Sequence, residues 1–270
     1  MTEATRIMAM VLLCLAPSVF ACEPIDGLAP LLKPGSVLLL GEIHGSAESP
    51  AFVSRAVCVG LETGHSITVA LEIPETEGAR IRRYLSSSGD ENARSAVLAG
   101  EFWTNPFQDG RRSQAMLDLI AHIGAWQRQG KAVRLVLLDA NDSTSDGRGR
   151  DQVMADNLQS AYEAWPEDIF IALTGNLHSR IMLTAQDRSM GSLFARAEPS
   201  ARVIALDVAY SDGTTWSCSS GDASSCGAHA TRGSGDDHGV RIVMRSTGDG
   251  FQGVYNVGRL TASPPAARAR

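Results

Sequence analysis

The chain has 270 residues, 44% of them hydrophobic, and a formal net charge of −6 at pH 7. This size and composition suit one globular domain of the α/β type, long enough to bury a sizeable core. The 24 Lys and Arg residues are interspersed with 30 Asp and Glu residues and form no basic block, so nucleic acid is not an expected partner.

The N-terminus has the features of a targeting segment. Met8 to Phe20 is an apolar stretch of about the length of a signal-peptide core, and it is too short to span a bilayer. Small residues precede Cys22 at the positions that a signal peptidase requires, namely Val19 and Ala21. We therefore expect residues 1–21 to be a signal peptide and the mature chain to be exported, periplasmic or secreted, without a transmembrane helix. The alternative is a hydrophobic N-terminal helix of a cytosolic protein.

Cysteine usage supports export. Once the signal peptide is removed, four of the five cysteines remain: Cys22, Cys58, Cys218 and Cys226. An even count in an exported domain predicts disulfides. Cys218 and Cys226 bracket a Ser/Gly-rich segment and can close it, which leaves Cys22 to pair with Cys58. A competing interpretation treats Cys22 as the lipid-modified residue of a lipobox and Cys58 as free, but Phe20 is bulky for that motif.

Short apolar runs alternate with amphipathic segments along the rest of the chain. The runs predict strands at Val37–Leu40, Ile67–Ile73, Val133–Leu138, Ile169–Leu173, Val203–Leu206, Val240–Met244 and Val254–Val257. The amphipathic segments predict helices at Pro50–Glu62, Glu75–Leu98, Gly110–Gln129 and Arg150–Trp165. This order implies right-handed crossovers and a mainly parallel, doubly wound sheet flanked by helices, in a single domain over residues 22–270.

Residues 211–239 interrupt this alternation. The segment is rich in Gly, Ser and Asp and is longer than ordinary loops inside compact domains. We expect a mobile surface excursion closed by a disulfide between Cys218 and Cys226. Its acidic residues lack the regular spacing of a calcium-binding loop.

Polar residues follow several of the predicted strands. The residues are Glu42 and His44, Glu72, Asp139, and Asn176 with His178. In parallel sheets, ligands bind beyond the carboxyl ends of the strands, so these side chains are expected to converge on one edge of the sheet. The pattern predicts an active site there.

The first strand ends in Gly41-Glu42-Ile43-His44-Gly45. Alternation along an extended chain places the side chains of Glu42 and His44 on one side. A carboxylate beside an imidazole forms either a general-base pair or two ligands for a divalent metal. Glu72, after the second strand, can orient an imidazole. The competing roles are a solvated acid and a helix-capping histidine.

The fourth strand opens into Gly175-Asn176-Leu177-His178. Asn176 can donate to a developing oxyanion or orient a carboxylate, and His178 can act as a second acid or base or as a second imidazole ligand. Asp139 and Asp207 also follow strands, with helix capping as the competing role. No Gly-x-Ser-x-Gly elbow and no phosphate-cradling loop is present in the sequence.

Four motifs together resemble a known superfamily, which comprises the erythromycin-esterase-like proteins, the ChaN-like haem-binding lipoproteins and the Tiki/TraB-type proteases. The matching elements are Gly41-Glu42-Ile43-His44, the strand that ends in Glu72, the helix Arg150-Asp151-Gln152-Val153-Met154-Ala155-Asp156-Asn157, and Gly175-Asn176-Leu177-His178. The similarity covers about residues 35–180. It also indicates a functional role for Arg150 and Asp151, which would otherwise suggest a surface ion pair.

The resemblance implies three different activities. Esterase-like members are expected to use a His base to activate water against an ester or lactone, Tiki-type members resemble metal-dependent proteases, and ChaN-like members resemble haem binders. His44 followed by Gly45 and Glu48 is closer to the esterase-like motif. The length of the chain and its export signal are closer to the ChaN-like group, and the chain lacks room for an extended helical substrate domain.

The first hypothesis is therefore an exported hydrolase that acts on a small-molecule or peptide substrate. His44 would be the general base, oriented by Glu42 or Glu72, while His178 and Asn176 would stabilise the oxyanion or protonate the leaving group. Arg150 would bind a substrate carboxylate or phosphate, and Asp151 would hold Arg150 or His178. In a metal-dependent version, the ligands of a divalent metal would be His44, Glu72 and His178.

Two alternatives remain at this stage. The chain could carry haem or a similar apolar cofactor without catalysis, with Phe102, Trp103 and Phe107 as a platform, although core or lid packing is the preferred role of this aromatic cluster. The polar edge could also belong to a degenerate scaffold in which it only stabilises the fold.

Overall fold

The computed structural model describes residues 22–267 except 141–148, 183 and 185. The predicted signal peptide lies outside these residues. The strands are β1 (Ser36–Glu42), β2 (Ile67–Pro74), β3 (Val133–Asp139), β4 (Ile169–Gly175), β5 (Arg202–Cys218), β6 (Cys226–Arg232), β7 (Arg241–Val243) and β8 (Gly253–Leu260). The α-helices are α1 (Glu48–Glu62), α2 (Gly78–Leu85), α3 (Glu91–Leu98), α4 (Glu101–Thr104), α5 (Gln114–Arg128), α6 (Arg150–Ala164), α7 (Asn176–Ser179) and α8 (Met190–Ala197). Short 3₁₀ turns occur at Ala29–Leu31, Glu75–Glu77 and Ala223–Ser225.

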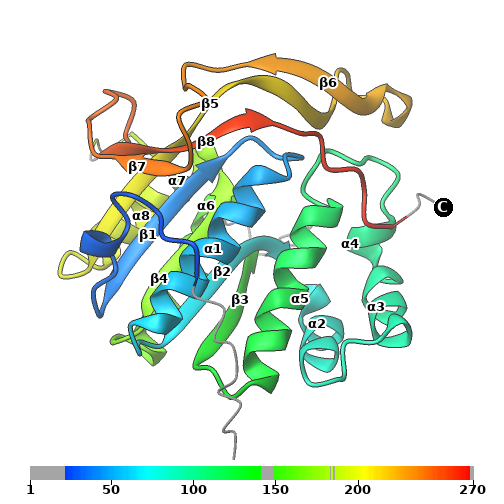
Figure 1. Ribbon diagram of the computed structural model, residues 1–270, viewed down its shortest axis with the longest axis horizontal. Coiled ribbons are helices and arrows are strands. Elements are labelled where there is room, and N and C mark those ends of the chain that lie inside the picture. The colour runs from blue at the N-terminus through cyan, green and yellow to red at the C-terminus, as the bar shows by residue number, and fades with distance from the viewer. Residues whose placement is uncertain (1–21, 141–148, 183, 185, 268–270) are drawn as a thin grey trace, which may run out of the picture.

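The strands form one eight-stranded sheet in the order β3-β2-β4-β1-β5-β8-β7, with β6 paired to β5 (Figure 1). Neighbours from β3 to β8 run parallel, whereas β7 pairs antiparallel with β8 and β6 antiparallel with β5. The predicted α/β class and the mainly parallel sheet are confirmed. Since β4 inserts between β1 and β2, the carboxyl ends of these three strands are adjacent.

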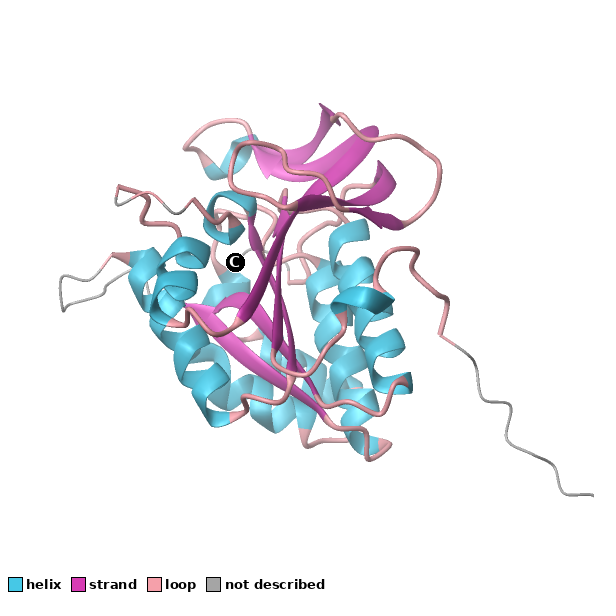
Figure 2. Ribbon diagram, turned by 90° about the vertical axis from the view of Figure 1, so that its left-hand side faces the viewer, coloured by secondary structure: helices cyan, strands magenta, loops and turns pink. Residues whose placement is uncertain are grey.

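Helices cover both faces of the sheet, as the edge-on view shows (Figure 2). Successive residues of β1 alternate between two buried clusters: Leu38 and Leu40 pack with the cluster that includes α1 and α5, and Val37 and Leu39 pack with the cluster of α6 and α8. A strand that is buried on both faces is a continuous apolar run, which is why the period-two pattern is missing from the sequence.

Two predicted helices have different boundaries in the structure. The segment Glu75–Leu98 is interrupted between Leu85 and Glu91, where Asp90 caps the start of α3 by accepting from the backbone N–H of Ala93 at 3.0 Å. The helix predicted from Gly110 begins at Gln114, because Ser113 is the N-cap and accepts from the N–H of Met116 at 3.3 Å. The residues before Ser113 are therefore free to form a loop at the edge of the sheet.

The excursion predicted at residues 211–239 contains regular structure. β5 continues for 17 residues and pairs antiparallel with β6, from Asp212 opposite Arg232 to Cys218 opposite Cys226. The Gly- and Ser-rich composition concealed this hairpin, whose β-branched and aromatic residues are few. The N–H of Trp216 donates to the carbonyl of Gly45 at 2.9 Å, so the hairpin packs against the loop that follows β1.

Both predicted disulfides are present. The Cα atoms are 5.7 Å apart in Cys22–Cys58 and 3.8 Å apart in Cys218–Cys226. A sulfur that forms a disulfide cannot at the same time carry a thioether-linked lipid, so the Cys22–Cys58 bond opposes the lipobox interpretation. Among the described residues, no helix is long and apolar enough to cross a membrane.

Candidate active site

Residues at the carboxyl ends of β1, β2 and β4 border one cavity of about 390 Å³, together with a loop and the start of α6. Glu42 lies opposite Gly175 in the pairing of β1 with β4, and Glu72 follows Leu71, which lies opposite Leu173 in the pairing of β2 with β4. The lining residues are Glu42, Ile43, His44, Glu72, Asp109, Arg111, Arg150, Gly175, Asn176, Leu177 and His178. The wall thus includes six of the predicted site residues: Glu42, His44, Glu72, Arg150, Asn176 and His178. Asp139 and Asp151 do not line the cavity, but they contact Arg150 and His178, respectively.

The His44 imidazole lies between two carboxylates. Its Nδ1 is 2.8 Å from Oε1 of Glu42, and its Nε2 is 3.5 Å from Oε1 of Glu72. A carboxylate can only accept, so both ring nitrogens are placed to donate, which requires the imidazolium form. Burial alone would lower the pKa of His44, but the charges and hydrogen bonds of Glu72 and Glu42 raise it to about 10.

Glu72 is the buried centre of the site, with 3% of its surface exposed. Its Oε2 accepts from the backbone N–H of Gly175 at 2.7 Å, and its Oε1 accepts from Nη2 of Arg150 at 2.6 Å. Burial alone would raise the pKa of Glu72, but the charges of His44 and Arg150 and the hydrogen bond from His44 hold it well below its usual value. Glu72 therefore remains a carboxylate that orients its neighbours.

The surroundings of His178 are different. Its Nδ1 is 2.8 Å from Oδ1 of Asp151, and its Nε2 is 2.9 Å from Nη1 of Arg150. A guanidinium N–H can only donate, so Nε2 of His178 accepts and carries a lone pair, while Nδ1 donates to Asp151. Asp151 is itself fixed by the backbone N–H of Met190 at the start of α8, at 2.7 Å. The two contacts thus orient the His178 ring, with Nδ1 toward Asp151 and Nε2 toward Arg150.

Arg150, the first residue of α6, connects these groups. Its Nε and Nη2 donate to the two carboxylate oxygens of Asp139, each at 2.7 Å. The bonds to Glu72 and His178 bring the total to four of the five N–H groups of a guanidinium. One N–H on Nη1 remains, which is enough to bind one substrate oxygen. It is too few for a bidentate bond to the substrate carboxylate or phosphate that the sequence suggested as the ligand of Arg150.

Two site residues, Asp109 and Arg111, were not predicted from the sequence. Arg111 donates from Nη1 to Asp139 at 3.1 Å and lies 3.7 Å from Glu72, and Asp109 holds the other end of the Arg111 guanidinium at 2.8 Å. Asp109 and Arg111 follow no strand, so strand-end reasoning could not find them. Asp139 ends β3 as the sequence indicated, but its role depends on Arg150 and Arg111.

Asn176 lines the cavity, and its side chain also interacts with Asp207. Asp207 is the last residue of the part of β5 that pairs with β1. Burial raises the pKa of Asp207 to about 6, and the hydrogen bonds from Val208 and Asn176 oppose this shift. The amide of Asn176 therefore lies near Asp207 as well as at the cavity.

Gly175 separates the two imidazoles. A Cβ added to Gly175 would lie 3.0 Å from Nε2 of His44 and 3.5 Å from Cδ2 of His178. Both rings therefore border the same small space above the Gly175 backbone, and the absence of a side chain keeps that space open to a substrate.

The expected metal ligands do not fit a divalent cation in this arrangement. The Arg150 guanidinium lies within hydrogen-bond distance of both Glu72 and His178 and occupies the Nε2 lone pair that a metal would need. A second cationic group, Arg111, is also present at the site. Over the described residues, no group of three or more His, Cys, Asp or Glu side chains is arranged to hold a metal.

The aromatic cluster does not provide a platform for haem. Trp103 is fully buried, and Phe102 is 6% exposed and covered by the Arg112 guanidinium, 4.7 Å from the ring centroid. Stacking of a planar ligand requires an open aromatic face, so Phe102 and Trp103 serve the core, which is the role that the sequence favoured for the cluster. Phe107 is half-buried and belongs to neither buried cluster.

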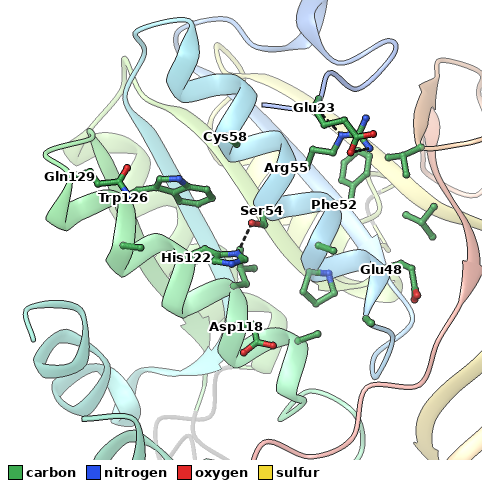
Figure 3. Close-up of a pocket in the computed structure, with 18 residues that line it drawn as sticks. Glu23, Glu48, Phe52, Ser54, Arg55, Cys58, Asp118, His122, Trp126 and Gln129 are labelled. Carbon is green, nitrogen blue, oxygen red and sulfur yellow. Dashed lines mark hydrogen bonds and ion pairs between the residues drawn. The ribbon is translucent and has the colours of Figure 1, made fainter. Parts of the chain in front are cut away.

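A larger cavity of about 820 Å³ lies between α1 and α5, away from the strand ends (Figure 3). Four of its polar groups form two pairs: Oγ of Ser54 is 2.8 Å from Nδ1 of His122, and Arg55 is 3.1 Å from a carboxylate oxygen of Glu23. Much of the remaining wall is alanine and other apolar side chains. Size alone therefore does not identify the active site, whereas the convergence of charged groups at the strand ends does.

No protein-family model and no curated protein matches the sequence. Among solved structures, a succinoglycan biosynthesis protein is similar over 89% of this chain and 93% of its own, with 11% identity and a TM-score of 0.61. A mutant of the erythromycin esterase EreC in its open conformation is similar over 89% of this chain and 95% of its own, with 12% identity and a TM-score of 0.57. A protein from Bacillus cereus is similar over 88% and 92%, respectively, with 11% identity and a TM-score of 0.51. The chain shares the fold of these proteins, in agreement with the superfamily resemblance of its motifs.

Proposed function

We propose that this chain is a hydrolase that activates water at the strand-end site against the carbonyl carbon of an ester, lactone or peptide bond. The observation that carries the proposal is the contrast between the hydrogen-bond partners of its two imidazoles, which face the same space above Gly175: carboxylates for His44, and a carboxylate and a guanidinium for His178. A neutral imidazole beside an imidazolium is the arrangement that a hydrolase needs for a base and an acid.

His178 is the general base in this mechanism, and His44 is the acid. This is the reverse of the roles that the sequence suggested for them, because His44 has no free lone pair between Glu42 and Glu72. Asp151 holds the Nδ1 proton of His178 and stabilises the charge that develops on the ring. Glu42 and Glu72 orient His44 and maintain its proton.

The reaction follows from these positions. When the substrate carbonyl oxygen draws Nη1 of Arg150 toward itself, Nε2 of His178 is released to accept a proton from water, and the water oxygen bonds to the carbonyl carbon. The negative charge on the former carbonyl oxygen is stabilised by Arg150. The bond from carbon to the leaving group then breaks as the leaving group takes the Nε2 proton of His44. Solvent removes the proton from His178 and returns one to His44, so the net reaction consumes one water.

The fold comparison with an erythromycin esterase supports a hydrolase at the level of analogy only, because one fold hosts many activities. Export is also part of the proposal. The two disulfides support it, since such bonds persist in oxidising compartments.

The test is hydrolysis of p-nitrophenyl acetate by the mature chain, with His178→Asn and His122→Asn compared. His178→Asn retains a donor toward Asp151 but removes the base. His122→Asn removes an exposed imidazole from the larger cavity between α1 and α5. We expect kcat/KM to fall about 10²–10⁴-fold in His178→Asn and to stay unchanged in His122→Asn. Equal rates for His178→Asn and the unmodified chain would contradict the proposal.

A further inference from the structure

Leu177 is the most exposed of the large hydrophobic side chains in the described part of the chain. It is 67% exposed, compared with 50% for Met244, 37% for Trp165 and 36% for Val243. Leu177 lies on α7, between the site residues Asn176 and His178, and it borders the same cavity. The apolar side chain thus stands in water directly beside the proposed base.

Folding does not account for a leucine at this position. The buried residue of α7 is Ser179, and Leu177 belongs to neither of the two buried clusters. A second apolar residue, Ile43, borders the cavity from the end of β1, between Glu42 and His44, with part of its surface packed against the core. Because β1 and β4 are adjacent strands, Leu177 and Ile43 give one polar cavity two apolar borders.

The charges of the cavity wall are balanced. Three carboxylates line it, Glu42, Glu72 and Asp109, and three cationic groups, His44, Arg111 and Arg150. These groups are paired with one another, and Arg150 retains one N–H. No cationic surplus is available for a substrate carboxylate or phosphate, whose burial would need a paired charge. One donor suits a single uncharged carbonyl oxygen.

The position of the acyl substituent follows from the proposed mechanism, on which this inference rests. The attacked carbon carries four groups: the former carbonyl oxygen at Arg150, the water oxygen at His178, the leaving group at His44 and the acyl substituent. The first three face polar partners deep in the site. The fourth is left to extend to the rim, where Leu177 stands.

We propose that the substrate is an uncharged ester, lactone or amide whose acyl side carries an apolar group that packs on Leu177 and Ile43. Leu177 is therefore a specificity-determining residue. It selects by burial of apolar surface, which amounts to about fourfold in kcat/KM for each buried methylene, from ~0.8 kcal/mol.

The test compares p-nitrophenyl acetate with p-nitrophenyl butyrate in the unmodified chain, in Leu177→Ser and in Met244→Ser. Met244 is the matched control because it is also an exposed large hydrophobic residue. It directly follows β7, an edge strand that is separated from β1 by β5 and β8. In the unmodified chain we expect kcat/KM for the butyrate ester to exceed that for the acetate ester roughly tenfold. Leu177→Ser should reduce this ratio to about twofold or less, and Met244→Ser should keep it. An unchanged ratio in Leu177→Ser would overturn the inference.

A binding measurement separates this inference from the proposed function. If the unmodified chain hydrolyses neither ester, the proposed function fails, and the apolar site is then judged by NMR with butyramide, acetamide and butyrate as probes. We expect butyramide to shift the methyl signals of Leu177 and Ile43 and to bind about tenfold more tightly than acetamide. Absence of these shifts, or tighter binding of the butyrate anion, would overturn the inference independently of catalysis.

Discussion

The end of β1 and the end of β4 carry the same kind of side chain in different surroundings. His44, beyond β1, has carboxylates at both ring nitrogens, whereas His178, beyond β4, has a carboxylate at one nitrogen and a guanidinium at the other. The first arrangement holds a proton and the second presents a lone pair. Neighbours from other strands, rather than the histidines themselves, therefore decide which imidazole is the acid and which the base.

The largest loss of activity is expected from replacing Arg150, because this residue contributes to the surroundings of both histidines. Arg150 contacts both Glu72 and His178, so Arg150→Met removes the partner of each and leaves the buried Glu72 and Asp139 with less compensation. We expect kcat/KM to fall about 10³-fold and urea denaturation to show a loss of about 2–4 kcal/mol.

Arg134→Met is the matched control for that substitution. Arg134 has the same 37% exposure and also pairs with a buried carboxylate, that of Asp168, but it lies at the amino-terminal edge of the sheet. The kcat/KM of Arg134→Met should stay at the level of the unmodified chain. If both variants lost activity equally, the effect of Arg150 would reflect stability alone.

Gly175 lies beneath both rings, so Gly175→Ala tests whether the two regions share one substrate space. The backbone of Gly175 is compatible with alanine, but the added Cβ would crowd Nε2 of His44 at 3.0 Å. We expect about a 10²-fold loss of kcat/KM from displaced catalytic groups. Gly227→Ala, where a Cβ would meet nothing within 4 Å, should retain activity. Full activity in Gly175→Ala would mean that the substrate lies elsewhere.

Glu72→Gln alters the surroundings of His44 while the pair of His178 and Asp151 remains. Glu72 is the main charge that raises the pKa of His44 to about 10, so the acid should lose its proton at lower pH in the variant. In the unmodified chain activity should decline as the pH rises through about 10, and in Glu72→Gln this decline should shift downward by about one pH unit or more. The pH profile of kcat/KM measures this shift, and an unshifted decline would assign it to another group.

The same pairing affects stability. Because the pKa of His44 in the folded chain lies above its ordinary value of 6.5, the stabilisation from its ion pairs is fully present below pH 6.5 and is lost as the pH rises through about 10. Unfolding free energies measured across this range should therefore decline, and the decline should be smaller in Glu72→Gln.

The smallest effect is expected outside both regions, at Asp207. Burial raises its pKa to about 6, above the ordinary value of 3.8, so its contribution to stability is complete below pH 3.8 and is lost as the pH rises through about 6. Asp207→Asn removes this penalty and should stabilise the chain at neutral pH by about 1 kcal/mol. Denaturant titrations at acidic and neutral pH measure the difference, and a destabilised variant would show that Asp207 acts mainly through its bond to Asn176.

The sequence was sufficient to predict the parts of this site that depend on strand order. Buried apolar runs followed by Glu42, Glu72 or Gly175 indicate parallel strands, and parallel strands bring their carboxyl ends together. Arg111 could not be predicted, because it lies in a loop whose position is set by the Ser113 cap and by packing against Trp216 and Gly45.

For a related reason, the sequence could not predict which of the two histidines carries the extra proton. The motifs Glu42-Ile43-His44 and Asn176-Leu177-His178 both place one histidine after a strand, and nothing within either motif distinguishes an acid from a base. The distinction comes from Glu72 and Arg150, which are 28 and 106 positions away from His44. The hairpin of β5 and β6 was not predicted because its Gly- and Ser-rich composition resembles that of a loop. Its regular structure comes from the pairing of its two strands with each other.

The most direct test of the account is nitrogen NMR of the histidine-labelled chain, with His44→Asn and His178→Asn used for assignment and the pH varied. The account predicts that His44 carries protons on both ring nitrogens at neutral pH and keeps them until the pH approaches about 10. It also predicts that His178 at neutral pH carries its proton on Nδ1 alone. A neutral His44 beside a doubly protonated His178 would contradict the account and return the role of general base to His44.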